Sequence, residues 1–418
     1  MIINFSVENF GSIKEKQTLS FLANKSDHLE DYYIIEPIKG LRLNKLALIY
    51  GANASGKTTV LKALDFLKYI NTNPFSKKTA KFDFKPFLFD DKTPSQNTKF
   101  EIEFVQFGEK YFYEVELNKN CIVYEKLLNY NPGKAVVFER TTDEKKELTS
   151  IKFGSKILKR KHFEDSLELF TLWNNTVIGG FFKSNIDNQI LKDVGVFFET
   201  QIAPMMSFDI AIDSTLSWGL FEGNLNTNFF IDVLKRADFS VHNIKVEVEN
   251  RDKENDDDDE DEDDEYKVEF VHRIKDKDYS LSFEEESLGT QRYYSFALLS
   301  YFLLKRDSII PIDELESSLH PDLFNHFLLT YLVNGKKESQ LIATTHNREI
   351  LNNRDIFRDD AIWFTDKNED SATELYSLAD FDSTVVRDTS NVLNAYKSGK
   401  LGGVPNLGDY YIDLDDAE

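Results

Sequence analysis

Residues 45–59 read Lys45-Leu46-Ala47-Leu48-Ile49-Tyr50-Gly51-Ala52-Asn53-Ala54-Ser55-Gly56-Lys57-Thr58-Thr59. The apolar run at the start is typical of a buried strand, and it leads directly into a glycine-containing turn. Beyond the turn, apolar residues recur at three- and four-residue spacing, which predicts an amphipathic helix: Val60, Leu61, Leu64, Leu67 and Ile70. The stretch therefore predicts a strand, a tight loop and a helix in immediate succession.

The loop fits the pattern G-x-x-x-x-G-K-[ST], in the strand and helix context that the pattern requires. Backbone N–H groups in such a turn, together with the positive end of the helix, can surround a polyphosphate. Lys57 would add a charge between the β- and γ-phosphates, and Thr58 a hydroxyl for Mg²⁺. A glycine turn that caps a helix by chance is the alternative. The predicted ATP-binding residues are Gly51, Asn53, Ala54, Ser55, Gly56, Lys57, Thr58 and Thr59.

A second signal is Ile309-Ile310-Pro311-Ile312-Asp313-Glu314, an apolar strand that ends in two carboxylates. Strand ends face the ligand crevice in a doubly wound sheet, so Asp313 is expected to join Thr58 at the metal. Glu314 is the candidate base for an attacking water. Pro311 predicts irregular or edge-like pairing at this strand.

Two further segments have chemically sensible roles at the same phosphate. Glu286-Ser287-Leu288-Gly289-Thr290-Gln291 opens a predicted helix, and Leu341-Ile342-Ala343-Thr344-Thr345-His346 places a histidine at a strand end. Each has a simpler alternative, because Ser287 or Thr290 could be an ordinary helix cap and His346 could be structural.

The remaining pattern suggests how the chain is organised. Residues 1–10 predict a strand, and residues 100–117 predict a β-hairpin. Residues 121–240 predict a mostly helical insertion. Two alternating strands, 245–249 and 266–270, lie on either side of a run of acidic residues. From residue 280, helices (292–305, 321–333 and one from Asn347) alternate with strands (308–312 and 340–344), which predicts a largely parallel α/β sheet. The expected divisions are 1–120, 121–240, 241–375 and a C-terminal segment, 376–418.

Composition limits the classes of function. The chain has 418 residues, with 73 acidic and 50 basic side chains, and a formal net charge of −23. This balance argues against a protein whose whole surface grips nucleic acid or anionic lipid. The single cysteine, Cys121, excludes an internal disulfide. A cytoplasmic protein is expected, without a signal peptide or membrane span.

The acidic side chains are concentrated in one place. Residues 256–265 are ten consecutive acids in a predicted hairpin loop, 249–265. The simpler interpretation of the run is a solvated loop. The alternative is that it docks a basic partner surface or mimics DNA phosphates. A basic cluster, Lys152, Lys156, Lys159, Arg160 and Lys161, is the candidate nucleic-acid contact or else a solvated helix face.

The order of motifs resembles the ABC class of ATPases, and within it the SMC, RecF and OLD-like soluble heads. After the P-loop come a signature (Ser287, Gly289, Thr290 and Gln291), the Walker B acids, a D-loop-like Ser317-Ser318-Leu319-His320-Pro321 and the switch His346. Leu288 stands where transporters carry glycine, and no Q-loop glutamine is obvious, with Gln96 and Gln106 as candidates. Further segments are similar to the RloA and AbiL group of phage-defence ATPases, to which the AriA subunit of PARIS is related: Asn9-Phe10-Gly11-Ser12, 100–117, 234–238 and 395–405.

The resemblance implies an α/β fold, namely an ABC-type P-loop ATPase head with a mixed or parallel sheet, an antiparallel β-subdomain and an inserted helical lobe. It also implies a homodimer or higher homo-oligomer that closes around ATP and Mg²⁺. The signature of one subunit would contact the γ-phosphate held by Lys57 of the other, with Glu314 as base and His346 as γ-phosphate sensor.

The resemblance further implies a partner. OLD-type proteins carry a Toprim nuclease domain after the ATPase, and the roughly 70 residues after His346 are too few for one. The expected function is an ATP-switched sensor or scaffold in anti-phage defence (abortive infection), controlling a separate Toprim-like or other nuclease effector and answering a phage-encoded trigger. The alternative is a RecF- or SMC-like ATPase that acts on DNA ends. A small-molecule kinase would leave the signature and His346 unexplained.

Overall fold

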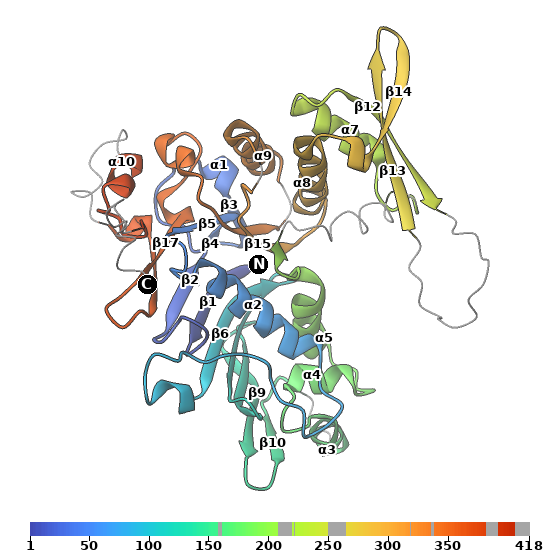
Figure 1. The fold of residues 1–418 in the computed structure, drawn as a ribbon. Coiled ribbons are helices and arrows are strands. Elements are labelled where there is room, and N and C mark those ends of the chain that lie inside the picture. The colour runs from blue at the N-terminus through green and yellow to red at the C-terminus, as the bar shows by residue number, and fades with distance from the viewer. Residues whose placement is uncertain are drawn as a thin grey trace, which may run out of the picture.

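The computed structural model describes residues 1–157, 161–207, 220, 222–249, 265–317, 319–335, 338–381 and 392–405 (Figure 1). The strands are β1 (Ile2–Glu8), β2 (Gln17–Ser20), β3 (Ile34–Ile38), β4 (Leu41–Asn44), β5 (Leu46–Gly51), β6 (Thr98–Gln106), β7 (Glu109–Leu117), β8 (Ile122–Asn129), β9 (Ala135–Asp143), β10 (Leu148–Phe153), β11 (Met206–Ser207), β12 (Val241–Glu249), β13 (Glu265–Ile274), β14 (Lys277–Ser282), β15 (Ile309–Asp313), β16 (Gln340–Thr344), β17 (Ile362–Lys367) and β18 (Thr373–Ser377). The α-helices are α1 (Glu30–Tyr33), α2 (Lys57–Thr72), α3 (Lys161–Phe170), α4 (Val177–Phe182), α5 (Gln189–Val196), α7 (Thr227–Arg236), α8 (Leu288–Lys305), α9 (Pro321–Asn334) and α10 (Val392–Lys397).

A six-stranded sheet in the order β11-β15-β16-β5-β17-β18 forms the centre of the molecule. All its pairings are parallel except that of β17 with β18. Strand β5, which precedes the P-loop, lies beside β16, and β16 lies beside β15. The carboxyl ends of these three strands therefore meet at one edge, where Gly51, Asp313 and Thr344 lie.

The two faces of this sheet belong to two different hydrophobic cores, as strand geometry requires. On β5, Ala47 and Ile49 join the core that contains the apolar stripe of α2, whereas Leu46, Leu48 and Tyr50 join the core that contains α8 and α9. Burial on both faces explains why β5 reads as an unbroken apolar run, and it fixes the strand directly before the P-loop.

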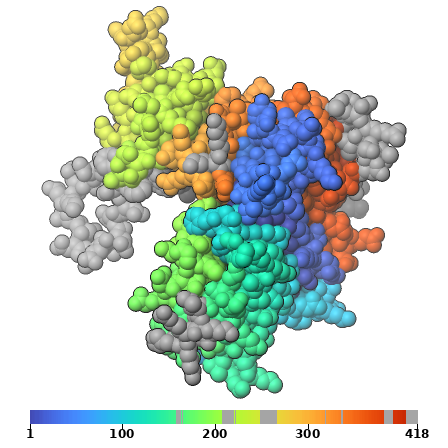
Figure 2. Space-filling view, turned by 180° about the vertical axis from the view of Figure 1, so that it is seen from behind, coloured from blue at the N-terminus to red at the C-terminus, as the bar shows by residue number. Residues whose placement is uncertain are grey.

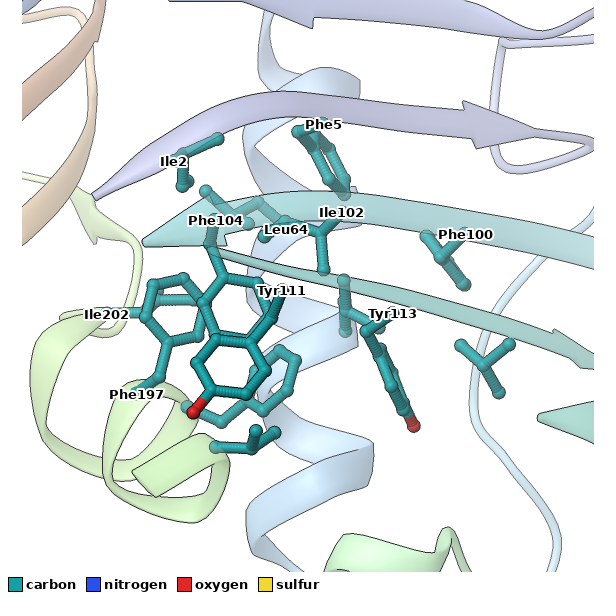
Figure 3. Close-up of a cluster of buried hydrophobic side chains, with 14 of the residues drawn as sticks. Ile2, Phe5, Leu64, Phe100, Ile102, Phe104, Tyr111, Tyr113, Phe197 and Ile202 are labelled. Carbon is teal, nitrogen blue, oxygen red and sulfur yellow. The ribbon is translucent and has the colours of Figure 1, made fainter. Parts of the chain in front are cut away.

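The second large sheet is antiparallel, in the order β10-β9-β8-β7-β6-β1-β2, and it packs against α2 on the side away from α8. Figure 3 shows Leu64 of α2 among side chains of this sheet, with Phe104 and Tyr111 beside Phe197. The Phe104 and Phe197 rings stack with centroids 3.9 Å apart. The P-loop helix is thus held between the two sheets.

The expectation of a mostly helical insertion at 121–240 is wrong for its first part. Residues 122–153 form β8, β9 and β10 and extend the antiparallel sheet, while α3, α4, α5 and α7 follow. The alternation is obscured because charged residues occupy buried positions: Glu125 of β8 pairs with Arg140 of β9, and both are fully buried. The expected division at residue 120 therefore falls within one sheet, and the division at 375 falls within β18.

A third sheet, β12-β13-β14, stands out from the body beside α7 and α8 (Figures 1 and 2). Strands β12 and β13 are antiparallel and pair from Val241 with His272 to Glu249 with Glu265, as the flanking strands of a hairpin should. The acidic run that connects them lies outside the described residues, apart from Glu265.

Three smaller expectations have clear outcomes. Helices α8 and α9 and strands β15 and β16 form close to the predicted bounds. The helix expected from Asn347 is only a 3-10 turn, η4 (Arg348–Asn352), which Asn347 caps through its side chain. Among the described residues, no helix combines the length and apolar character needed to cross a bilayer.

Candidate nucleotide site

The P-loop has the backbone that a phosphate-binding turn needs. Gly56 is the N-cap of α2 with φ of 109°, and no side chain caps the helix. The first N–H groups of α2 have no intrahelical acceptor, so they remain available to an anion. A Cβ at Gly56 would lie 2.1 Å from Thr373 Oγ1, so glycine is required there for space as well as for φ.

A network of hydroxyl hydrogen bonds, which the sequence does not predict, holds the P-loop in place. Ser55 Oγ lies 2.6 Å from Thr365 Oγ1, and Thr373 Oγ1 lies 2.9 Å from Ser55 O and 2.7 Å from Ser12 Oγ. Ser12 Oγ is in turn 3.0 Å from Thr59 Oγ1. The loop is therefore tied to β17, to β18 and to the turn after β1. Isolated serines and threonines carry no spacing that would have revealed this network.

Lys57 points into the loop, and its ammonium donates to Gly51 O at 2.9 Å and Ala52 O at 3.1 Å. Burial lowers the pKa of Lys57, and the nearby carboxylates of Asp313, Glu314 and Glu316 oppose that shift. A partly buried ammonium beside open N–H groups is suited to a polyanion, which would replace solvent as its counter-charge.

Thr58 and Asp313 meet as the sequence predicted. Thr58 Oγ1 donates to Asp313 Oδ2 at 2.8 Å, and Thr344 Oγ1 donates to Asp313 Oδ1 at 2.5 Å. A hydroxyl and a carboxylate oxygen at the mouth of a phosphate loop are the oxygen donors that Mg²⁺ prefers, together with water and phosphate. The donor set therefore fits a magnesium–nucleotide complex, although the ion itself is an expectation.

Glu314 lies at the end of β15 in the left-handed region, with φ of 50°. Its N–H donates to Thr344 Oγ1 at 2.8 Å, so the Thr344 hydroxyl touches both acids. A non-glycine residue at positive φ is uncommon and is held there by its surroundings. The sequence alone predicts no role for Thr344. Its position at the end of the strand beside the Walker B strand is the signal that could have identified it.

His346 follows β16 and lines the same cavity as the P-loop. The backbone N–H of His346 donates to the carboxylate of Glu316, a second residue for which the sequence alone predicts no role. Burial lowers the pKa of His346, Lys57 and Arg348 lower it further, and Glu316 and Glu314 act in the opposite sense. The imidazole is therefore held in its neutral form at pH 7.

The signature residues cap α8 within this chain. Ser287 is the N-cap and accepts from Thr290 N at 3.1 Å, and Gln291 Nε2 donates to Phe283 O and Glu286 O. The helix-cap alternative is therefore realised. Ser287 is exposed, and Leu288 is 78% exposed. A role in trans is compatible with this exposure and stays a prediction.

The other candidates do not join the site. Ser317 O accepts from Arg292, and His320 caps α9, whereas Ser318 lies outside the described residues. Gln106 is buried at the end of β6, and Gln96 follows a short turn before it. Of the basic cluster, Lys152 is exposed and Lys156 is half-buried; Lys159 and Arg160 lie outside the described residues.

A cavity of about 610 Å³ opens beside the P-loop. Its walls combine the loop, His346 and Arg348 with the end of β17 and the C-terminal segment: Gly51, Ala52, Asn53, Ser55, His346, Arg348, Asp366, Lys367, Tyr396, Val404 and Pro405. The volume lies in the range typical of small-ligand sites. The P-loop and His346 line this cavity, and Asp313 meets the loop through Thr58. Together these residues define a P-loop nucleotide-binding protein.

The chain belongs to the family described as "AAA domain, putative AbiEii toxin, Type IV TA system", whose model matches residues 46–169 and 191–352. Family membership, sheet order and P-loop together confirm the expected P-loop ATPase head. No curated protein matches the chain.

Solved structures similar to the chain include SMC heads. The SMC head domain of Thermotoga maritima is 14% identical, with a TM-score of 0.41, covering 90% of this chain and 98% of its own. An SMC head bound to the C-terminal winged-helix domain of ScpA is 12% identical, with a TM-score of 0.46, covering 90% and 97%. The Pyrococcus furiosus SMC head with an extended coiled coil, bound to the C-terminal domain of ScpA, is 11% identical, with a TM-score of 0.43, covering 90% and 96%.

Proposed function

We propose that the chain is a Mg²⁺-dependent ATPase of ABC type, in which two copies close around ATP, and that this closure controls a separate nuclease effector in anti-phage defence. The observation that carries the enzymatic part is the Thr344 hydroxyl, which orients Asp313 and Glu314 together beside the P-loop. Mg²⁺, when bound by Thr58 and Asp313, would neutralise charge on the β- and γ-phosphates.

The side chains of the site divide the work of hydrolysis. The α2 N–H groups and Lys57 would hold the phosphates, and Glu314 would accept a proton from the attacking water. Neutral His346 can accept a hydrogen bond from that water or donate one to the γ-phosphate. Thr344 keeps the two acids in register, so Asp313 is held beside Thr58 at the metal position while Glu314 faces the water.

The dimeric part is supported by the exposure of the first signature residue, Ser287, although Thr290 of the same motif is buried. Ser287 and Leu288 lie at the surface at the start of α8, so a second copy could present them to the P-loop of the first. The family description, which names a toxin of a Type IV toxin–antitoxin system, favours abortive infection as the cellular role. An effector nuclease and a phage trigger are the partners this role needs.

Steady-state hydrolysis tests the enzymatic part. The purified chain should hydrolyse ATP only with Mg²⁺, and Glu314→Gln should bind ATP normally but reduce turnover by about a hundredfold or more. Equal turnover in the two proteins would contradict the assignment of Glu314. Nuclease activity that survives loss of both Asp313 and Glu314 would contradict the proposal that cleavage belongs to a partner.

Plating efficiency tests the defence role. Cells that express the chain with its neighbouring gene should resist a phage panel, and the Glu314→Gln variant should change that resistance. DNA-stimulated ATPase activity of the chain alone, without protection in cells, would instead favour the RecF- or SMC-like alternative.

A further inference from the structure

The described C-terminal segment packs against the first residue of the P-loop. A Cβ on Gly403 would lie 3.3 Å from Thr365 O and 3.4 Å from Gly51 Cα, so the two backbones are in near contact. Gly403 has φ of 66°, and its N–H donates to Asp366 Oδ2 at 3.0 Å. Residues more than 300 positions apart in sequence therefore form one wall of the nucleotide cavity.

Tyr396 connects this turn to the sheet. Its hydroxyl donates to Gly403 O at 3.0 Å, and its ring lies 5.6 Å from Phe364 and 6.0 Å from Tyr50. The ring is 4% exposed, so it is part of the core and is not open as a platform for a base. The ring of Tyr396 is therefore held rigidly and can support a side chain that packs on its outer face.

Arg348 occupies that outer face. Its guanidinium carbon lies 6.0 Å from the Tyr396 ring centroid, at the distance of a cation–π contact. Arg348 lines the cavity with His346, two residues before it, and with the P-loop residues. Within the described part of the chain, no hydrogen bond or ion pair engages its guanidinium. Its five donors are therefore free to face the cavity.

The charges around the cavity favour an anion. Arg348 and Lys367 contribute two cations, whereas the one acidic wall residue, Asp366, is engaged by the Gly403 N–H. A guanidinium forms paired hydrogen bonds with phosphate oxygens more readily than other side chains do. We propose that Arg348, positioned by Tyr396 and the 401–405 turn, binds the terminal phosphate of the nucleotide from the same subunit. The inference rests on the proposed ATPase function and adds a residue to its site.

Calorimetric titration with AMP-PNP and with ADP tests the proposal. A charge-assisted bond to the terminal phosphate predicts that Arg348→Ala weakens AMP-PNP binding by about tenfold or more and ADP binding by less than about threefold. Arg348→Lys should lie between the wild type and Arg348→Ala, because it keeps a charge but not the paired donors. Lys400→Ala is the matched control: it removes an exposed cation from the C-terminal segment, outside the cavity, and should bind both nucleotides as the wild type does.

Variants of Tyr396 test the positioning role. Tyr396→Phe removes only the bond to Gly403 O and should shift AMP-PNP affinity in the same direction as Arg348→Ala, by a smaller factor. In a double variant, Tyr396→Phe should add little to Arg348→Ala, because both changes act on one guanidinium. Full additivity would contradict the positioning role.

Unchanged AMP-PNP affinity in Arg348→Ala would overturn the proposal, and so would an equal loss of AMP-PNP and ADP affinity. If the wild-type chain binds and hydrolyses ATP, either of these results for Arg348→Ala would leave the proposed function intact. A wild-type chain that binds neither nucleotide would refute both.

Discussion

The Thr344 hydroxyl is the contact on which the geometry of both Walker B acids depends, so Thr344→Val is the most informative single change. Valine keeps the shape of threonine but removes the group that donates to Asp313 Oδ1 and accepts from Glu314 N–H. Thr344 is fully buried, so water cannot readily replace it.

The size of the effect follows from the two bonds. A hydrogen bond to a charged group contributes about 1.5–3 kcal/mol, and one between neutral groups about 0.5–1.5 kcal/mol. If only the charged bond matters in the transition state, turnover should fall by roughly 10- to 160-fold. Nucleotide affinity should change little, because the loop and Lys57 are untouched.

The assay is steady-state ATP hydrolysis, with nucleotide affinity measured in parallel by calorimetry. Thr344→Ser is the control: it restores the hydroxyl and should recover most of the turnover, at a cost in stability of about 1 kcal/mol for the missing methyl. Wild-type turnover in Thr344→Val would refute the reasoning, and so would an equal loss in the valine and serine variants.

Three other predictions follow from single residues. Gly56→Ala should abolish nucleotide binding and lower the melting temperature, because its Cβ would meet Thr373 Oγ1, whereas Gly40→Ala, at a positive φ with open space, should cost much less. Burial lowers the pKa of His346 and its neutral form is the active one, so turnover should decline only when the pH falls below the ordinary imidazole pKa. A His346→Gln variant should lose that acidic limb of the pH profile, and an unchanged limb would assign it to another group. Burial raises the pKa of Glu125 to about 7, although Arg140 opposes the shift. The native state therefore holds an extra proton between about pH 4.5 and 7, and the free energy of unfolding should fall as pH rises through that window. Glu125→Gln should flatten this dependence of the unfolding free energy on pH in urea titrations, and an unchanged dependence would count against the assignment.

The sequence predicted the parts of the fold whose residues lie close together along the chain. Strand β5, the P-loop and α2 were identified because burial on both sheet faces and helical spacing leave clear patterns. The Thr58–Asp313 contact was also predicted, because parallel strands bring their carboxyl ends to one edge.

What the sequence did not predict depends on contacts between distant, unremarkable residues. Glu125 and Arg140 occupy buried positions in β8 and β9, which removes the apolar alternation that would identify those strands. The Ser12–Thr373–Ser55 hydroxyl network and the approach of Gly403 to Gly51 each join segments hundreds of residues apart. No local periodicity encodes such contacts.

In the proposed dimer, ATP is held between the P-loop of one copy and the signature of another. Light scattering of Glu314→Gln with Mg²⁺ and ATP tests it most directly. We expect the 48.5 kDa chain to double in mass with ATP but not with ADP, and we expect the added substitution Gly289→Asp to prevent the doubling. A Glu314→Gln chain that binds ATP without any change in mass would contradict the claim.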